Sequence, residues 1–271
     1  MLQKAAIIGI IGGMGPEAGR ILHGLIIEET KKLRHVSQDQ DHCDVLHFGF
    51  PSMIPDRATY IFDQTQPNPV DVLIEIVRSA VFVGKKFNRP ILSVVPCNTF
   101  HAPVLLNDLM ERIKQEKLDE WFVLCDFVKE TVEGIAENFP TLKKIGLLST
   151  TGTRNSLIYK NVLDEKGVEL IQVTAEEQLK VDEAIYNPVD GLKALSKASG
   201  RIKDLLRRYV QTLKAQGAEK VILGCTEFPL AFEELEKEER EDLIDPMRLV
   251  AQRINKIFSL DRKSTRLNSS H

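Results

Sequence analysis

Short apolar segments alternate with longer amphipathic segments along almost the whole chain, and this alternation restricts the possible folds strongly. The short segments are rich in Val, Ile and Leu, as strands buried on both faces of a parallel sheet are. The longer segments carry apolar residues at three- and four-residue spacing, which predicts helices. Together they predict an α/β fold built on parallel sheets. The predicted strands cover residues 5–11, 45–48, 91–95, 122–124, 144–148, 170–173 and 220–223.

The predicted helices fill most of the gaps, and the length of the chain suggests two domains. They cover residues 16–33, 69–87, 99–113, 126–137, 154–166, 176–185, 202–216 and 246–257. Because domains usually contain about 100–200 residues, 271 residues predict two similar, doubly wound domains. We place them at residues 1–117 and 118–260, with the last helix able to return to the first domain. The polar segment 261–271 is expected to be a disordered tail that need not be native.

Composition excludes several classes of function. The net charge is -3, from 36 basic and 39 acidic residues spread along the chain, which argues against a nucleic-acid partner. The sequence has neither a signal peptide nor the run of about 18 apolar residues that a membrane span needs, so a cytoplasmic protein without a membrane partner is expected. Four cysteines are too few for a disulfide framework in a chain of this length. Each is therefore structural, metal-binding or catalytic.

A glycine-rich turn follows the first predicted strand. The sequence Gly-Gly-Met-Gly-Pro at 12–16 allows a tight turn into a helix, whose free N–H groups can bind a carboxylate or phosphate. The spacing also fits a dinucleotide fingerprint, but no acidic residue follows the second strand, where Gly-Phe-Pro-Ser stands at 49–52. A nucleotide site is thus the weaker alternative, and a purely structural turn is another.

Two cysteines, Cys97 and Cys225, follow two of the predicted strands in the same way. They stand 128 residues apart, about one domain, which favours two similar halves with a cleft between the carboxyl ends of their sheets. A helix N-terminus can lower a thiol pKa from about 8.5 towards neutrality, so each could exchange a proton. A single cysteine is more often a small core residue, yet a matched pair favours catalysis. Neither has the spacing of a zinc site.

Four motifs together identify a resemblance. They are Gly-Gly-Met-Gly-Pro at 12–16, Pro-Asp-Arg at 55–57, Pro-Cys-Asn-Thr at 96–99 and Gly-Cys-Thr-Glu at 224–227. In this order they resemble the aspartate/glutamate racemases, and most of all aspartate racemase, over nearly the whole chain to about residue 260. The resemblance implies two similar α/β domains around a cleft, a homodimer, and racemisation without pyridoxal phosphate, any other cofactor or a metal.

The resemblance also implies the site residues. It assigns catalysis to Cys97 and Cys225, and binding of an amino-acid substrate to Met14, Arg57, Asn98, Thr99, Lys193 and Thr226. The Arg57 guanidinium could clamp the distal carboxylate of an acidic substrate in two parallel hydrogen bonds, and Lys193 could add a second positive charge. Either could instead be an exposed surface residue. His101 could stabilise the Cys97 thiolate or be packed.

These residues predict a two-base reaction. Inverting an amino-acid centre removes the α-hydrogen from one face and delivers a proton to the other, which suits two thiols. We therefore expect racemisation of an acidic amino acid, aspartate before glutamate. The alternatives are a related decarboxylase or isomerase, which needs only one cysteine, and a protein that binds an amino acid or nucleotide without turning it over.

Overall fold

The chain forms two four-stranded sheets in which every neighbouring pair of strands is parallel, so the predicted α/β class is confirmed. The computed structural model describes residues 6–195, 197–232 and 240–268, with side chains described up to residue 257. The strand order is β2-β1-β3-β4 in one sheet and β6-β5-β7-β8 in the other. Two compact units contain these sheets: Met1–Glu130 with Met247–His271, and Thr131–Pro246.

The first unit contains the sheet formed by β1 (Ile7–Gly12), β2 (Val45–Gly49), β3 (Ile91–Val94) and β4 (Phe122–Cys125). Its helical elements are α1 (Pro16–Leu33), η1 (Asp39–Asp41), α2 (Arg57–Phe62), α3 (Pro69–Phe87), η2 (Thr99–His101), α4 (Pro103–Gln115), η3 (Leu118–Glu120), the start of α5 (Phe127–Asn138) and nearly all of α11 (Pro246–Asn268). The chain leaves this unit within α5 and returns to it at Met247.

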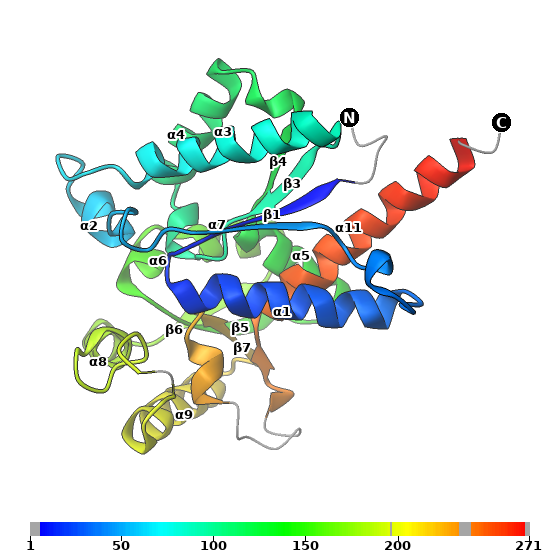
Figure 1. The fold of residues 1–271 in the computed structure, drawn as a ribbon. Helices are drawn as coiled ribbons and strands as arrows, with labels where there is room; N and C mark the ends of the chain where they lie inside the picture. The colour runs from blue at the N-terminus through cyan, green and yellow to red at the C-terminus, as the bar shows by residue number, and fades with distance from the viewer. Residues whose placement is uncertain (1–5, 196, 233–239, 269–271) are drawn as a thin grey trace. The chain divides into compact units, whose positions relative to one another are not determined.

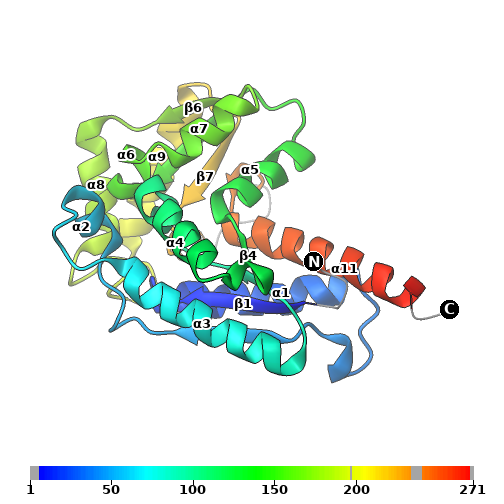
Figure 2. The ribbon, with the colours of Figure 1, turned by 90° about the horizontal axis from the view of Figure 1, so that it is seen from above.

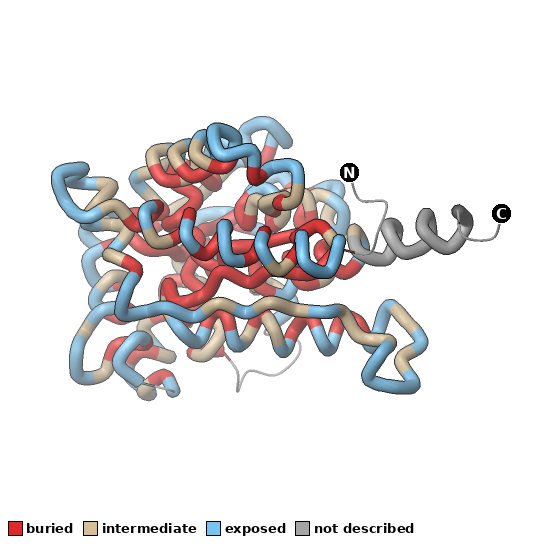
Figure 3. The backbone as a smooth tube through the Cα atoms, turned by 45° about the horizontal axis from the view of Figure 1, so that its top comes forward, coloured by how far each residue is buried: buried red, intermediate tan, exposed pale blue. Residues whose placement is uncertain are grey.

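Helices cover both faces of the first sheet. Ile7 and Ile11 of β1 belong to a buried cluster with α3 and α4, whereas Ile8 and Ile10 belong to a cluster with α1 and α11. Figure 1 shows α3 on one side of β1 and α1 on the other. The whole of β1 is buried, as the red backbone of Figure 3 illustrates. Continuous apolar runs are therefore required here, because successive side chains of each strand face opposite layers of helices.

The second unit repeats this strand order. Its sheet contains β5 (Lys144–Ser149), β6 (Glu169–Gln172), β7 (Lys220–Gly224) and β8 (Leu243–Ile244), and its helical elements are α6 (Thr151–Asn155), α7 (Ile158–Glu165), α8 (Ala175–Tyr186), α9 (Gly200–Ala215) and η4 (Phe228–Ala231), with the rest of α5. Figure 2 shows α6 to α9 around β6 and β7. The two central strands β1 and β5 correspond, and so do their neighbours β3 and β7.

Several elements differ from the predicted ones. The helix predicted at 99–113 is divided into η2 and α4, because Pro103 lacks the N–H that a continuous helix would use. The helix predicted at 154–166 becomes α6 and α7, separated by Leu157 at a φ of 56°. Short elements such as α2 and β8 were not predicted. β4 lies beyond the predicted domain boundary at residue 117, yet it pairs with β3 in the first sheet.

The C-terminal segment also differs from the prediction. Helix α11 continues past residue 260 to Asn268 because the sequence from 261 contains neither proline nor glycine to end it, and residues 269–271 lie outside the described part. Within the described ranges, every helix is too short or too polar to cross a bilayer.

Candidate active site

The residues predicted for the first unit gather where its strands end. β1 and β3 are parallel neighbours, with Ile10 opposite Val94, so the turn after β1 and the loop after β3 leave the same edge of the sheet. Met14 lies in the first of these segments and Cys97 in the second, and both belong to one buried cluster with Ile54. Cys97 is 5% exposed. This edge therefore holds a nearly buried thiol beside the glycine-rich turn.

His101 holds the segment that carries Cys97. Its Nε2 accepts a hydrogen bond of 3.0 Å from the N–H of Phe127, so its Nδ1 carries the proton and donates to the Cys97 carbonyl oxygen at 2.9 Å. Burial lowers the pKa of His101, which keeps the ring neutral. Of the two possibilities raised by the sequence, the packed histidine is confirmed. A neutral ring bound to the backbone is not a charged partner for the thiolate.

Arg57 begins α2, the short helix that follows β2 and its loop. The helix starts here because Asp56 caps it, with its Oδ1 accepting the N–H of Thr59 at 2.9 Å. The Arg57 side chain is 12% exposed, and its Nη1 lies 4.0 Å from Asp56 Oδ2. An exposed surface arginine, one of the predicted alternatives, is therefore excluded. Solvent screens the charge of a mostly buried guanidinium less, so its attraction to a carboxylate is stronger than at the surface.

Asn98 and Thr99 complete the first half of the site. Asn98 precedes η2 and Thr99 is its first residue, and both are buried. Helix α2 contacts η2, so the element that carries Arg57 packs against the turn that carries Thr99. The five residues predicted in this unit, Met14, Arg57, Cys97, Asn98 and Thr99, thus come from three neighbouring segments at one edge of the sheet.

Cys225 follows β7 directly in the second unit and is also 5% exposed. Its thiol donates to Glu227 Oε2 at 3.0 Å, and the Thr226 hydroxyl donates to the same oxygen at 3.1 Å. Burial raises the pKa of Cys225 well above its usual range, and the Glu227 carboxylate raises it further, against the opposing effect of Lys193. The predicted lowering of this pKa is wrong, because η4 is a single short turn and burial outweighs its dipole.

Lys193 follows α8 in the second unit. It is exposed, and its ammonium group stands 4.9 Å from the centre of the Tyr186 ring, within the range of a cation–π contact. Its positive charge opposes the rise in the pKa of Cys225. Of the residues predicted in the second unit, Cys225 and Thr226 share the Glu227 carboxylate, and Lys193 contacts Tyr186.

Sequence analysis missed two features of this second half. Glu227, the last residue of the Gly-Cys-Thr-Glu motif, is buried and bound to the thiol. Thr150 and Thr151 follow β5, and Ser149 stands opposite Gly224, so this turn leaves the sheet beside Cys225. The repeated strand order was the signal for the turn, since β5 corresponds to β1 and its glycine-rich turn.

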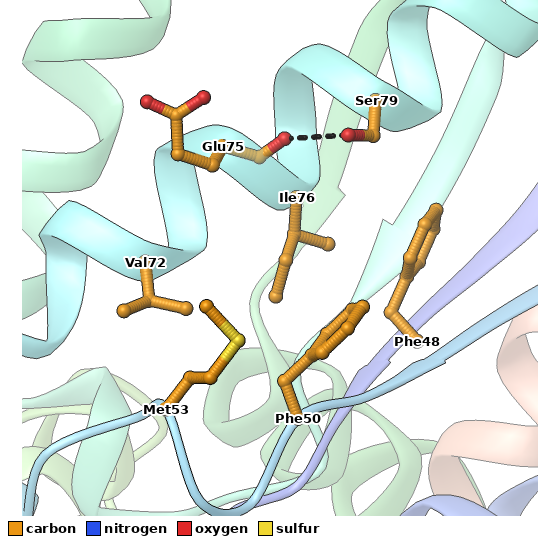
Figure 4. A pocket seen from close by; sticks show the side chains of 7 residues that line it. All are labelled: Phe48, Phe50, Met53, Val72, Glu75, Ile76 and Ser79. Atoms are coloured by element: carbon orange, nitrogen blue, oxygen red, sulfur yellow. Dashed lines mark hydrogen bonds between the residues drawn. The ribbon is translucent and has the colours of Figure 1, made fainter.

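Among the described residues no group of three or more His, Cys, Asp or Glu side chains could hold a metal ion. A pocket with about 380 Å³ of open space lies between the end of β2, the loop that follows it and α3 (Figure 4). It is lined by Phe48, Phe50, Met53, Val72, Glu75, Ile76 and Ser79. The lining is mostly apolar and contains no cysteine, and Glu75 is paired with Arg78.

Comparison with known proteins identifies the family. A sequence model described as Asp/Glu/hydantoin racemase matches residues 11–254, which include both cysteine motifs. The chain belongs to this family. It is therefore an amino-acid racemase, an isomerase of a class that needs no pyridoxal phosphate.

Individual members of the racemase family agree with this assignment. The broad specificity amino-acid racemase RacX of Bacillus subtilis strain 168 is 24% identical over 235 residues, 85% of this chain and 89% of RacX. Picrophilus torridus aspartate racemase has a TM-score of 0.69 at 20% identity, covering 96% of this chain and 99% of its own. For glutamate racemase RacE1 of Bacillus anthracis the TM-score is 0.61 at 20% identity, with 97% and 84% covered. At such identities the two structures establish a shared fold.

Proposed function

We propose that this racemase inverts an acidic amino acid, aspartate in preference to glutamate, with Cys97 and Cys225 as its two acid–base groups. One observation carries the proposal. The two thiols follow β3 and β7, which occupy the same place in the two sheet orders, and both are nearly buried. Two cysteines that only fill the core would not be expected to recur at matching strand ends beside polar side chains.

The chemistry requires the two thiols to reach the α-carbon from opposite faces. In one direction the Cys97 thiolate removes the α-proton, and the Cys225 thiol delivers its own proton to the other face. Cys225 suits the donor role because its raised pKa keeps it protonated at neutral pH. In the reverse direction Cys225 must act as the base. Glu227 is placed to accept the thiol proton beforehand, since the S–H already points at its carboxylate.

Binding and charge stabilisation fall to the neighbouring residues. Arg57 would pair with the side-chain carboxylate of the substrate, and Lys193 would add positive charge in the second half. Asn98, Thr99 and Thr226 offer amide and hydroxyl groups beside the two thiols, where negative charge develops as the α-proton leaves. Met14 would line the apolar side of the substrate site. Aspartate is preferred because the four sequence motifs resemble aspartate racemase most.

Two further expectations belong to this proposal. The resemblance implies that the protein is a homodimer and that it is cytoplasmic. Light scattering of the purified protein tests for the homodimer. A decarboxylase or other isomerase remains the second candidate, but the presence of both cysteines favours racemisation over a reaction that needs one thiol.

The proposal is tested by incubating the protein in D2O with a panel of L-amino acids and no added cofactor. Chiral chromatography and mass spectrometry should show D-aspartate appearing with deuterium at the α-carbon, and slower conversion of glutamate. Binding without deuterium exchange would indicate a non-catalytic protein. Release of carbon dioxide would indicate a decarboxylase, and inversion of only non-acidic amino acids would contradict the proposed substrate class.

A further inference from the structure

We propose that Asp182 is a positioning residue in the second half of the active site. It holds the turn at Thr150–Thr151 and the segment that carries Lys193 in place relative to Cys225. The inference rests on the proposed function and extends it to a residue outside the motifs. Asp182 lies on α8, and four observations support its role.

The carboxylate of Asp182 binds the turn after β5 through two atoms of Thr151. Its Oδ1 accepts the Thr151 N–H at 3.0 Å, and its Oδ2 accepts the Thr151 hydroxyl. Thr151 is the first residue of α6, so its N–H has no partner within the helix. Thr150, the cap of this helix, accepts the N–H of Thr153 instead. The turn therefore depends on α8 for the hydrogen bonds of Thr151.

Two further side chains join the same elements. Gln178, one turn before Asp182 on α8, donates from Nε2 to the Ser149 carbonyl oxygen at 2.8 Å. Arg154 of α6 donates from Nη1 to the carbonyl oxygen of Val173, which precedes α8, at 2.6 Å and to Gln178 Oε1 on α8 at 3.4 Å. Helices α6 and α8 contact each other. A network of this kind allows little independent movement between the turn and α8.

The far end of α8 leads directly to Lys193. The N–H groups of Leu192 and Lys193 donate to the carbonyl oxygens of Ala184 and Ile185 at 2.9 and 3.1 Å. Gly191 permits this tight return, because an added Cβ would stand 2.5 Å from the Asn187 carbonyl oxygen. Lys193 then lies over the ring of Tyr186, the last residue of α8. One helix thus supports both the hydroxyl-bearing turn and the lysine.

The third element of the half-site is Cys225, and its distance from the turn is set by the sheet. Ser149 and Gly224 are paired residues of β5 and β7, and adjacent strands lie about 4.8 Å apart. The positions of Thr150 and Cys225 are therefore tied together by the strands. Asp182 supplies the remaining constraint, since it fixes α8, and with it Lys193, to the same turn.

The test compares steady-state kinetics of Asp182→Ala with the wild-type enzyme, using whichever of L-aspartate and L-glutamate turns over faster. A displaced Thr150–Thr151 turn and Lys193 weaken substrate binding, so we expect KM to rise about tenfold while kcat changes less than about threefold. Thr151→Val should raise KM in the same way, and Thr151→Ser, which keeps the hydroxyl, should restore it. Asp164→Ala, which breaks an exposed pair with Lys160 on α7, is the matched control and should leave both constants unchanged.

A purely structural role gives a different result. If Asp182 only stabilises the fold, the variant contains a smaller folded fraction, which lowers apparent kcat and leaves KM as in the wild type. That outcome, or a Thr151→Ser enzyme as impaired as Thr151→Val, would overturn the positioning role and leave the proposed function intact. A wild-type protein that inverts neither amino acid would overturn both.

Discussion

Glu227 accepts a hydrogen bond from the Cys225 thiol and places a negative charge beside it. A carboxylate there stabilises the protonated thiol, so its removal should favour the thiolate and lower the pKa of Cys225. Burial remains, and it keeps this pKa above the usual value. For Glu227→Gln we therefore expect the alkylation of Cys225 by iodoacetamide, followed by peptide mass spectrometry across pH, to begin at lower pH than in the wild type.

The same variant should lose racemase activity, because Cys225 no longer has a carboxylate to take its proton before it acts as a base. Glu165→Gln, an exposed substitution at the end of α7, serves as the control and should change neither property. An alkylation profile for Glu227→Gln that is unchanged, or that moves to higher pH, would contradict the role given to Glu227.

Arg57 is mostly buried beside Asp56 and on a helix that contacts the turn of Thr99. Replacing it with alanine should raise KM for acidic substrates strongly, with a loss of about 2–4 kcal/mol in kcat/KM, because a charge-assisted pair to the substrate is removed. Arg78→Ala, which removes a surface arginine of α3 paired with Glu116, should leave the kinetics unchanged. Equal kinetics of Arg57→Ala and wild type with every dicarboxylic substrate would remove Arg57 from the site.

The individual site residues differ in how far sequence could predict them. Cys97 and Cys225 were found because each ends an apolar run in the same way. His101 was ambiguous, because its role depends on the N–H of Phe127, a partner 26 residues away. The raised pKa of Cys225 was not predictable from a local motif, since burial by the surrounding core is its largest cause.

Among the elements, α11 shows how a distant segment completes the first core. Asn255 is fully buried, donates to the carbonyl oxygens of Ile26 and Ala251, and accepts the hydroxyl of Thr30 at 2.8 Å. Asn255→Ala leaves some of these groups without partners, so it should lower the free energy of unfolding by about 1–3 kcal/mol. Urea denaturation monitored by circular dichroism measures this. Gln252→Ala on the same helix is the control; equal stability of the two variants would show that the network contributes little.

Strands and long helices were predicted best, because their apolar periodicity reflects the layers that bury them. β1 and α3 begin and end close to the expected residues, and α1 starts where Pro16 follows the glycine turn. Short elements were missed for a physical reason. β8 contains two residues and α2 contains six, which is too few to show a periodic pattern of apolar residues. β8 forms by pairing with β7, and α2 forms because Asp56 caps it.

The whole molecule repeats one strand order, β2-β1-β3-β4 and then β6-β5-β7-β8. Sequence predicted two similar halves from the matched cysteine motifs, and the repeated parallel sheets confirm that similarity. A domain boundary at residue 117 stays a prediction, whereas helix α11 stands as far as Asn268 where a disordered tail from 261 was predicted. Pairing between strands that are distant in sequence, such as β4 with β3, is invisible to local patterns. The sequence allowed the last helix to return to the first domain, and the chain does return to the first unit at Met247.

The central claim is that two thiols serve the two faces of one α-carbon, and deuterium exchange by single-cysteine variants tests it most directly. Cys97→Ser and Cys225→Ser should each lose racemisation, because a serine hydroxyl is too weak an acid to share a proton near neutral pH. Each variant keeps one thiol, so each should exchange the α-hydrogen of one enantiomer in D2O, and the two should prefer opposite enantiomers. Cys43→Ser should behave as wild type. Full racemisation by Cys97→Ser or Cys225→Ser, or the same preferred enantiomer for both, would contradict the account.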